Sequence, residues 1–159
     1  MPIVLAVVAL ALASQIAIDL PFSDVPLTAQ SFAVLLVGAA LPPARAALAV
    51  MLWLGLAALG APLLANGASG LGGPTTGYLL AMPFAAGMVS FRPSFFAMLA
   101  AHAVILAAGT LWLAARIDPD AALAGGFWPF VPGALIKSLL AAALAPHLRR
   151  RCDSATKTP

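Results

Sequence analysis

The sequence predicts an all-α integral membrane protein with six transmembrane helices and cytoplasmic N- and C-termini. Of its 159 residues, 63% are hydrophobic and only 8% are charged, whereas about 25% of the residues of an ordinary soluble domain are charged. A helix that crosses a bilayer needs about 20 mostly apolar residues, so six spans use nearly the whole chain. We therefore expect a single membrane domain over residues 1–149, followed by a basic cytoplasmic tail over residues 150–159.

Six apolar segments are separated by prolines and other helix-breaking residues. Pro42 and Pro43 separate the second segment from the third, and Pro93 precedes the fifth, where proline ends or starts a helix. The second segment is short, which favours a tilted, broken or partly buried helix. The predicted spans are Ile3–Ile18, Ala29–Leu41, Ala44–Leu59, Thr76–Ser90, Ser94–Arg116 and Gly133–Arg149.

Basic residues alternate with the predicted spans and so indicate their orientation. Arg45 lies between the second and third spans, and Arg92 lies between the fourth and fifth. The opposite loops hold one basic residue, Arg116. Because cytoplasmic loops of membrane proteins carry an excess of Lys and Arg, this pattern places both termini inside. Four further basic residues follow the sixth span, Arg149, Arg150, Arg151 and Lys157, whereas the opposite loops carry Asp19, Asp24, Asp118 and Asp120.

The segment from Asn66 to Tyr78 is rich in Gly, Ser and Thr, although it lies within an uncharged stretch from Ala46 to Phe91. Backbone that is neither helix nor closed barrel is tolerated near membrane depth only where protein or enclosed water satisfies its amides. We therefore expect this loop to border a cavity. A ligand held there is expected to be small, and uncharged where it meets the loop.

Lys137 lies within the sixth predicted span, where a charged side chain costs about 2.5 kcal/mol or more at the helix centre. One interpretation is that its ammonium contacts a ligand, with Asp19 and Asp24 as other candidate counter-ions. The alternative is that the side chain extends along the helix to the outer interface. We favour ligand contact, chiefly because positive charge is scarce on that side.

Three other polar side chains are candidates for the same pocket. Gln30 and Asn66 have amides that both donate and accept hydrogen bonds, and Tyr78 adds a ring with a hydroxyl group. Such groups complement a neutral amide or urea-like ligand. Each can equally pack or lie at the membrane interface.

Small residues recur at four-residue spacing in the first predicted span, at Ala9, Ala13 and Ala17. A narrow face of small side chains lets another helix approach closely, so this face is a candidate docking surface for a second membrane subunit. The alternative is that an alanine-rich helix produces this spacing by chance.

Residues for catalysis or metal binding are scattered. The single cysteine, Cys152, lies in the basic tail, and His102 and His147 are each alone on their helices. The chain has no motif for ATP hydrolysis. We therefore expect no metal, no cofactor and no nucleic-acid partner. Two other classes stay open, a membrane enzyme that acts on an amide or lipid, and a structural or assembly subunit without a ligand.

Three segments resemble the BioY family, the biotin-specific substrate-binding subunits, or S components, of energy-coupling factor transporters. They are Leu20–Leu36, Leu59–Leu80 and Pro132–Lys137, which include Pro-Phe-Ser-Asp-Val-Pro-Leu-Thr-Ala-Gln and Gly-Pro-Thr-Thr-Gly-Tyr-Leu. The resemblance implies biotin uptake through the bacterial cytoplasmic membrane, in association with a transmembrane coupling subunit and cytoplasmic ATPases. It also implies that Gln30, Asn66, Tyr78 and Lys137 bind biotin, in either orientation. A closely related alternative is that the chain moves its ligand alone, as a facilitator.

The chain departs from the family pattern at two positions. Thr76 stands where the family usually has Gly, and Ala134 stands where it usually has an acidic residue, one turn before Lys137. Residues three apart face each other on a helix, so the missing acid leaves Lys137 freer to meet the ligand. The same change removes a hydrogen-bond acceptor, and a lower affinity or an altered specificity is expected.

Overall fold

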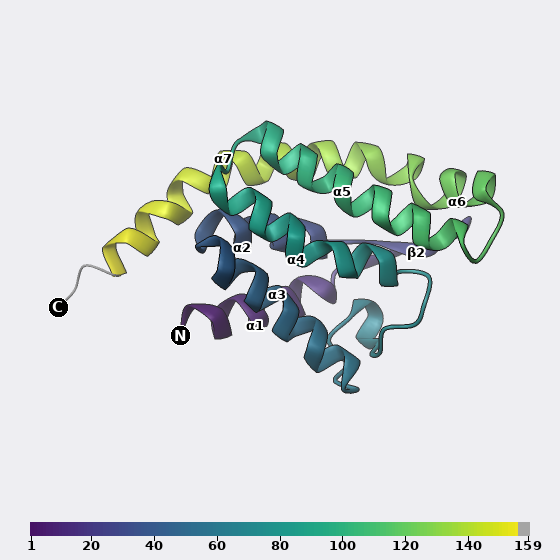
Figure 1. Ribbon diagram of the computed structural model, residues 1–159, viewed down its shortest axis with the longest axis horizontal. Helices are drawn as coiled ribbons and strands as arrows, with labels where there is room; N and C mark the ends of the chain where they lie inside the picture. The colour runs from purple at the N-terminus through teal and green to yellow at the C-terminus, as the bar shows by residue number, and fades with distance from the viewer. Residues whose placement is uncertain (156–159) are drawn as a thin grey trace.

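The computed structural model describes the backbone of residues 1–155 and the side chains of residues 1–148. In this part of the chain six long helices run back and forth between the two ends of a bundle, and α1 begins at the same end where α7 finishes (Figure 1). The long helices are α1 (Pro2–Ser14), α2 (Gln30–Ala40), α3 (Pro43–Ala58), α4 (Thr76–Phe91), α5 (Phe95–Ala114) and α7 (Val131–Ala155).

The predicted architecture of six long apolar helices is confirmed, because each predicted span corresponds to one long helix, whereas the orientation of the termini stays a prediction. The four middle spans agree with the observed helices to within two residues at either end. Two helical segments, Phe95–Ala114 and Pro119–Leu148, are long and apolar enough to cross a membrane, and the other four helices are apolar but shorter. Prolines at the starts of α1 and α3 occupy first-turn positions, where a missing N–H costs nothing.

A short antiparallel hairpin replaces the end of the first predicted span. Helix α1 stops at Ser14, and Ala17 already pairs with Thr28 across the hairpin, next to the pair of Ile18 and Leu27. Apolar residues at Ile18 and Leu20 alternate with polar Asp19, the period of a strand rather than a helix. The prediction that the helix reaches Ile18 was therefore wrong. The strands are β1 (Ala17–Leu20) and β2 (Ser23–Thr28).

The connection between α5 and α7 contains two elements that the sequence analysis missed, α6 (Pro119–Gly126) and the 3-10 turn η2 (Trp128–Phe130). Asp118 caps α6, accepting hydrogen bonds from the amides of the second and third following residues at 3.0 and 3.1 Å. Helix α7 continues through residues 150–155 of the predicted tail, and residues 156–159 lie outside the described part of the chain.

Helices α4 and α5 approach each other closely through two glycines. A Cβ atom on Gly77 would overlap Trp112 of α5, and a Cβ atom on Gly109 would overlap the ring of Tyr78 of α4. Small residues permit such close helix contacts where apolar burial between helices gives little driving force, as in a membrane. This packing fixes Tyr78 in the interior, where it is 6% exposed.

The outer surface of the bundle is apolar. Large side chains such as Leu12, Phe96 and Leu139 are more than 60% exposed, and an outward apolar surface of this extent suits lipid rather than water. The hairpin and the loops before α4 and α6 lie at the end opposite to the α2–α3 and α4–α5 connections (Figure 1). The basic and acidic loops thus lie at opposite ends of the bundle.

Candidate ligand pocket

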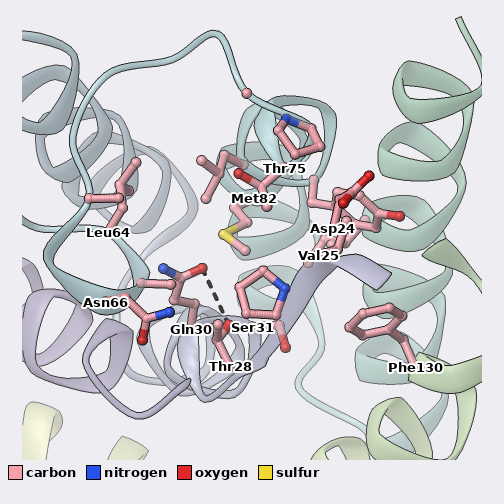
Figure 2. A pocket seen from close by; sticks show the side chains of 18 of the residues that line it. Asp24, Val25, Thr28, Gln30, Ser31, Leu64, Asn66, Thr75, Met82 and Phe130 are labelled. Atoms are coloured by element: carbon pink, nitrogen blue, oxygen red, sulfur yellow. Dashed lines mark hydrogen bonds between the residues drawn. The ribbon is translucent and has the colours of Figure 1, made fainter. Parts of the chain in front are cut away.

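A cavity of about 730 Å³ lies at the hairpin end of the bundle, within the 300–1,000 Å³ that is typical of small-molecule sites. The hairpin, the loop between α3 and α4, and helices α2, α4, α5 and α7 all contribute to its walls. Figure 2 shows Leu64 and Asn66 on one side of it, and Asp24, Val25 and Phe130 on the other. Residues 68–75 of the polar loop line the cavity, so the prediction that this loop borders a cavity is confirmed.

The loop between α3 and α4, which lines the pocket, is held by hydrogen bonds to the hairpin side and to α5. On the hairpin side Asn66 donates to both carboxylate oxygens of Asp19, at 3.0 and 3.2 Å, and Gln15 donates to the carbonyl of Leu64 at 3.2 Å. On the α5 side the indole N–H of Trp112 donates to the carbonyl of Gly73 at 3.1 Å. These contacts give some of the loop's polar groups protein partners, which non-helical backbone near membrane depth requires.

Asn66 lies at the exposed rim of the pocket, in a strained backbone conformation. Its φ of 56° and ψ of 29° fall in the left-handed region, which Asn tolerates better than most residues. Both N–H···O contacts of its amide go to Asp19, so its donor group is occupied by the hairpin and only its amide oxygen is left for a ligand. The sequence predicted that Asn66 lies at the pocket, but it did not predict that Asp19 is its partner.

Lys137 lines the pocket from α7 and bridges two other elements. Its Nζ donates to the carbonyl of Thr28, at the end of β2, at 2.6 Å, and to the hydroxyl of Ser31 on α2 at 3.2 Å. These partners hold the ammonium at the pocket instead of letting it extend to the outer interface. An ammonium has three donors, so one remains for a ligand. Neither partner is a carboxylate, unlike the counter-ions that the sequence suggested.

Gln30 is the first residue of α2 and is 5% exposed. Its Oε1 accepts a hydrogen bond from the hydroxyl of Thr28 at 3.3 Å, drawn in Figure 2. This contact orients the amide and assigns the oxygen, leaving the amide nitrogen as the donor available to a ligand. Gln30 and Lys137 are therefore both held by the same residue at the end of β2.

Tyr78 presents its ring to the pocket but uses its hydroxyl elsewhere. The hydroxyl donates to the carbonyl of Gly126, at the end of α6, at 2.7 Å, and the hydroxyl of Thr110 reaches the same carbonyl at 3.4 Å. The ring also faces Phe130, with 6.3 Å between ring centroids. Tyr78 thus forms an apolar wall and a link between α4 and α6, and its phenolic proton is already committed.

His102 lines the pocket as well, which the sequence analysis did not predict. Its Nδ1 lies 2.9 Å from the hydroxyl of Ser138 on α7, and the ring is 3% exposed. The residues three and four positions further along α5, Ile105 and Leu106, line the same wall. This helical spacing was the signal in the sequence, but it is shared by many buried histidines.

The small-residue face predicted for α1 is only partly helical. Ala9 is exposed and Ala13 is half-buried, but Ala17 lies in β1, so the three residues do not form one helical stripe. The face of α1 that packs into the bundle is formed by Ala6, Leu10 and Ser14, and Ala9 is left on the outside.

The fold and the cavity together define a class, a helical membrane protein with a cavity of ligand size at one end of its bundle. The chain belongs to the BioY family, whose family model matches residues 1–154.

Several curated relatives are named as biotin transporters, among them two that each match most of this chain. One is the biotin transporter BioY2 of Lactococcus lactis subsp. cremoris (strain MG1363), 33% identical over 87% of this chain and 84% of its own length. The other is the biotin transporter BioY of Rhizobium etli, 37% identical over 80% of this chain and 79% of its own length. The fold is similar to a crystal structure of the S-component for biotin from an ECF-type ABC transporter, with a TM-score of 0.83, 23% identity, and coverage of 92% of this chain and 87% of that one.

Proposed function

We propose that this chain captures biotin and takes part in its uptake, as the substrate-binding S component of an energy-coupling factor transporter. The observation that carries the proposal is the cavity, an apolar pocket into which Gln30 and Lys137 place hydrogen-bonding groups. The curated relatives named as biotin transporters support the choice of biotin. The chain acts in this proposal as a binding subunit and catalyses no reaction of its own.

The chemistry of biotin complements the polar groups of the pocket. Its ureido group offers two N–H donors and a carbonyl acceptor, its fused rings and chain are apolar, and its carboxylate is anionic. The amide nitrogen of Gln30 and the ammonium of Lys137 are donors that suit the carbonyl or the carboxylate, and Tyr78, Leu79 and Phe130 suit the apolar parts. A buried polar pocket rejects ligands that leave its groups unpaired, which gives selectivity without chemistry.

The proposed cellular setting is the bacterial cytoplasmic membrane, with both termini in the cytoplasm and the pocket facing outside. Arg45 in the first turn of α3 and Arg92 directly after α4 support this orientation. A transmembrane coupling subunit and cytoplasmic ATPases complete the transporter. Because Ala9 and Ala13 remain on the helical part of α1, we propose that this face contacts the coupling subunit, without Ala17 as a helical member.

Binding of biotin to the purified chain tests the substrate. Isothermal titration in detergent or nanodiscs should show one site per chain, and saturating biotin should raise the melting temperature, since a ligand that binds only the folded state stabilises it. If biotin at micromolar concentration neither binds nor stabilises the protein, the substrate assignment is wrong.

Uptake of labelled biotin tests the assembly. Cells that make this chain together with coupling subunits and ATPases should accumulate more biotin than cells that make the chain alone. Equal accumulation in both would instead indicate a self-sufficient facilitator. A cross-linkable residue at position 9 should capture the coupling subunit if the α1 face is the docking surface, and a residue placed at Phe96 on α5 provides the comparison site.

A further inference from the structure

The side chain of His102 has an unfinished set of hydrogen bonds inside the proposed biotin pocket. Its Nε2 is the one buried side-chain nitrogen or oxygen without a hydrogen-bond partner among the described residues. Buried polar groups are nearly always paired, and an unpaired one in a native protein calls for an explanation such as a missing ligand. His102 also lines the cavity, so the unpaired atom and the ligand site coincide.

The polar groups that the pocket offers a ligand favour one tautomer of the ring. Nδ1 lies against the hydroxyl of Ser138 on α7, which can donate or accept, so this contact fits either tautomer. The groups that Gln30 and Lys137 leave for a ligand are both donors, so the N–H groups of a urea-like ligand need an acceptor elsewhere in the pocket. In the tautomer with its hydrogen on Nδ1, Nε2 carries a lone pair and supplies that acceptor.

The surroundings of the ring leave few protein donors to satisfy Nε2. The pocket residues one turn along α5 are Ile105 and Leu106, and the nearby α7 position that faces the pocket is Ala134. Lys137 uses two of its three donors on Thr28 and Ser31. Met82 in the same wall is flexible and unbranched, which lets the wall adjust when a ligand presses against it.

We infer that His102 Nε2 is a specificity-determining acceptor, which takes a hydrogen bond from an N–H group of the ligand in this pocket. The inference rests on the proposed function, and for biotin it assigns the donor to the ureido ring, because the carboxylate and the ureido carbonyl have no hydrogen to give. The ureido end then lies at the α5–α7 wall. Nδ1 is already paired with Ser138, so Nε2 is the ring atom left for the ligand.

The first test compares biotin with its two singly N-methylated ureido derivatives, by titration against the natural chain and against His102→Phe. The natural chain should bind biotin more tightly than at least one methylated derivative. His102→Phe should weaken biotin binding roughly 10- to 100-fold, the range that follows from removing one partner of a buried hydrogen bond. It should also remove the preference over that derivative. An unchanged affinity and preference in His102→Phe would overturn the inference.

The second test does not depend on the stability of a variant. The chain has two histidines, so selective ¹⁵N labelling of the imidazoles gives a small set of resonances, which His147→Gln assigns. Adding biotin should move the Nε2 resonance of His102 in the direction of an acceptor gaining a hydrogen bond, and should move Nδ1 much less. If biotin binds and Nε2 does not move, His102 has only a structural role. If the natural chain binds no biotin in either experiment, the proposed function itself fails.

Ser138→Ala is the matched control, because it removes the partner of Nδ1 and leaves Nε2 in place. It should lower the melting temperature about as much as His102→Phe does, yet retain the preference for biotin over the methylated derivative. Loss of that preference in Ser138→Ala but not in His102→Phe would contradict the assignment of Nε2 as the specificity group.

Discussion

The inner wall and the rim of the pocket are built in different ways. The inner wall consists of side chains from α4, α5 and α7 that are nearly inaccessible, such as Tyr78 and His102, and it is held by glycine-mediated helix packing. The rim consists of the hairpin and the polar loop, where Asn66 is exposed and is held by hydrogen bonds to Asp19. The inner wall has few ways to rearrange, whereas the rim can open by breaking a few exposed bonds.

This difference assigns separate tasks to the two regions. Densely packed interiors transmit small changes in volume as strain, so a change in the inner wall alters both stability and the identity of the ligand that fits. Exposed loops have lower local stability, and they supply the opening through which ligands enter and leave. Changes in the inner wall should therefore alter stability and equilibrium affinity, and changes at the rim should mainly alter rates.

The largest effect is expected from Gly109→Ala, in the inner wall. The added Cβ would overlap the ring of Tyr78, which cannot move away without separating α4 from α5. Overpacking of this kind costs about 1–3 kcal/mol or more, so the melting temperature in detergent should fall sharply and biotin affinity should fall with it. Gly87→Ala in α4 is the control, because nothing lies within 4 Å of its added Cβ. Equal melting temperatures for the two variants would show that the glycine contact is not tight.

The next largest effect is expected from Lys137→Met, which keeps the apolar stem and removes the ammonium. A hydrogen bond to a charged group contributes about 1.5–3 kcal/mol, so biotin affinity measured by titration should fall roughly 10- to 100-fold. Ser31→Ala removes one partner of Lys137 but not the charge, and it should cost less than tenfold. If Lys137→Met leaves biotin affinity unchanged, Lys137 does not contact the ligand and its role is only to hold Thr28.

The comparison of the two regions also explains what the sequence could and could not predict. Helix positions followed from apolar runs and prolines, and the loop over the cavity followed from its polar, glycine-rich composition, because both are local patterns. The hairpin escaped notice because the apolar stretch of α1 continues into Ile16 and Ile18, so strand alternation was visible over only a few residues. Helix α6 was missed because its alanines and glycines give no strong periodic signal.

The partners of the site residues depended on tertiary structure and could not be predicted. The four predicted residues, Gln30, Asn66, Tyr78 and Lys137, line the pocket as expected. However, the carboxylate of Asp19 accepts a hydrogen bond from Asn66 and not from Lys137. The sequence separation of these pairs explains the difficulty, since Lys137 and Thr28 lie 109 residues apart. Whether the four residues bind biotin stays a prediction.

A smaller effect is expected from Tyr78→Phe, which keeps the ring and removes the hydroxyl. The lost bond to the carbonyl of Gly126 should cost about 0.5–1.5 kcal/mol of stability, because Thr110 still reaches the same oxygen. Biotin affinity should change less than threefold, since the phenolic proton is directed at α6 and not at the ligand. A tenfold loss of affinity at nearly unchanged melting temperature would show that the phenolic oxygen contacts biotin.

The smallest effect on stability is expected from Asn66→Ala, at the rim. Losing an exposed hydrogen bond to a charged group costs about 0.2–1 kcal/mol, and biotin affinity should fall by no more than a few-fold. Most of that loss should come from faster dissociation, as is usual for changes at one interface. Stopped-flow measurement of biotin release from the purified chain separates the two rates.

A double-mutant cycle with Asp19→Ala then distinguishes a latch from a ligand contact. If Asn66 acts only by holding Asp19, the two single variants should release biotin at similar rates, and the double variant should be no faster than either. Asp24→Ala removes the same charge from the pocket lining without breaking this bond, and it should leave the release rate near that of the natural chain. If Asn66→Ala weakens binding much more than Asp19→Ala and the effects add, Asn66 contacts biotin directly through its amide oxygen, and the rim then shares in recognition.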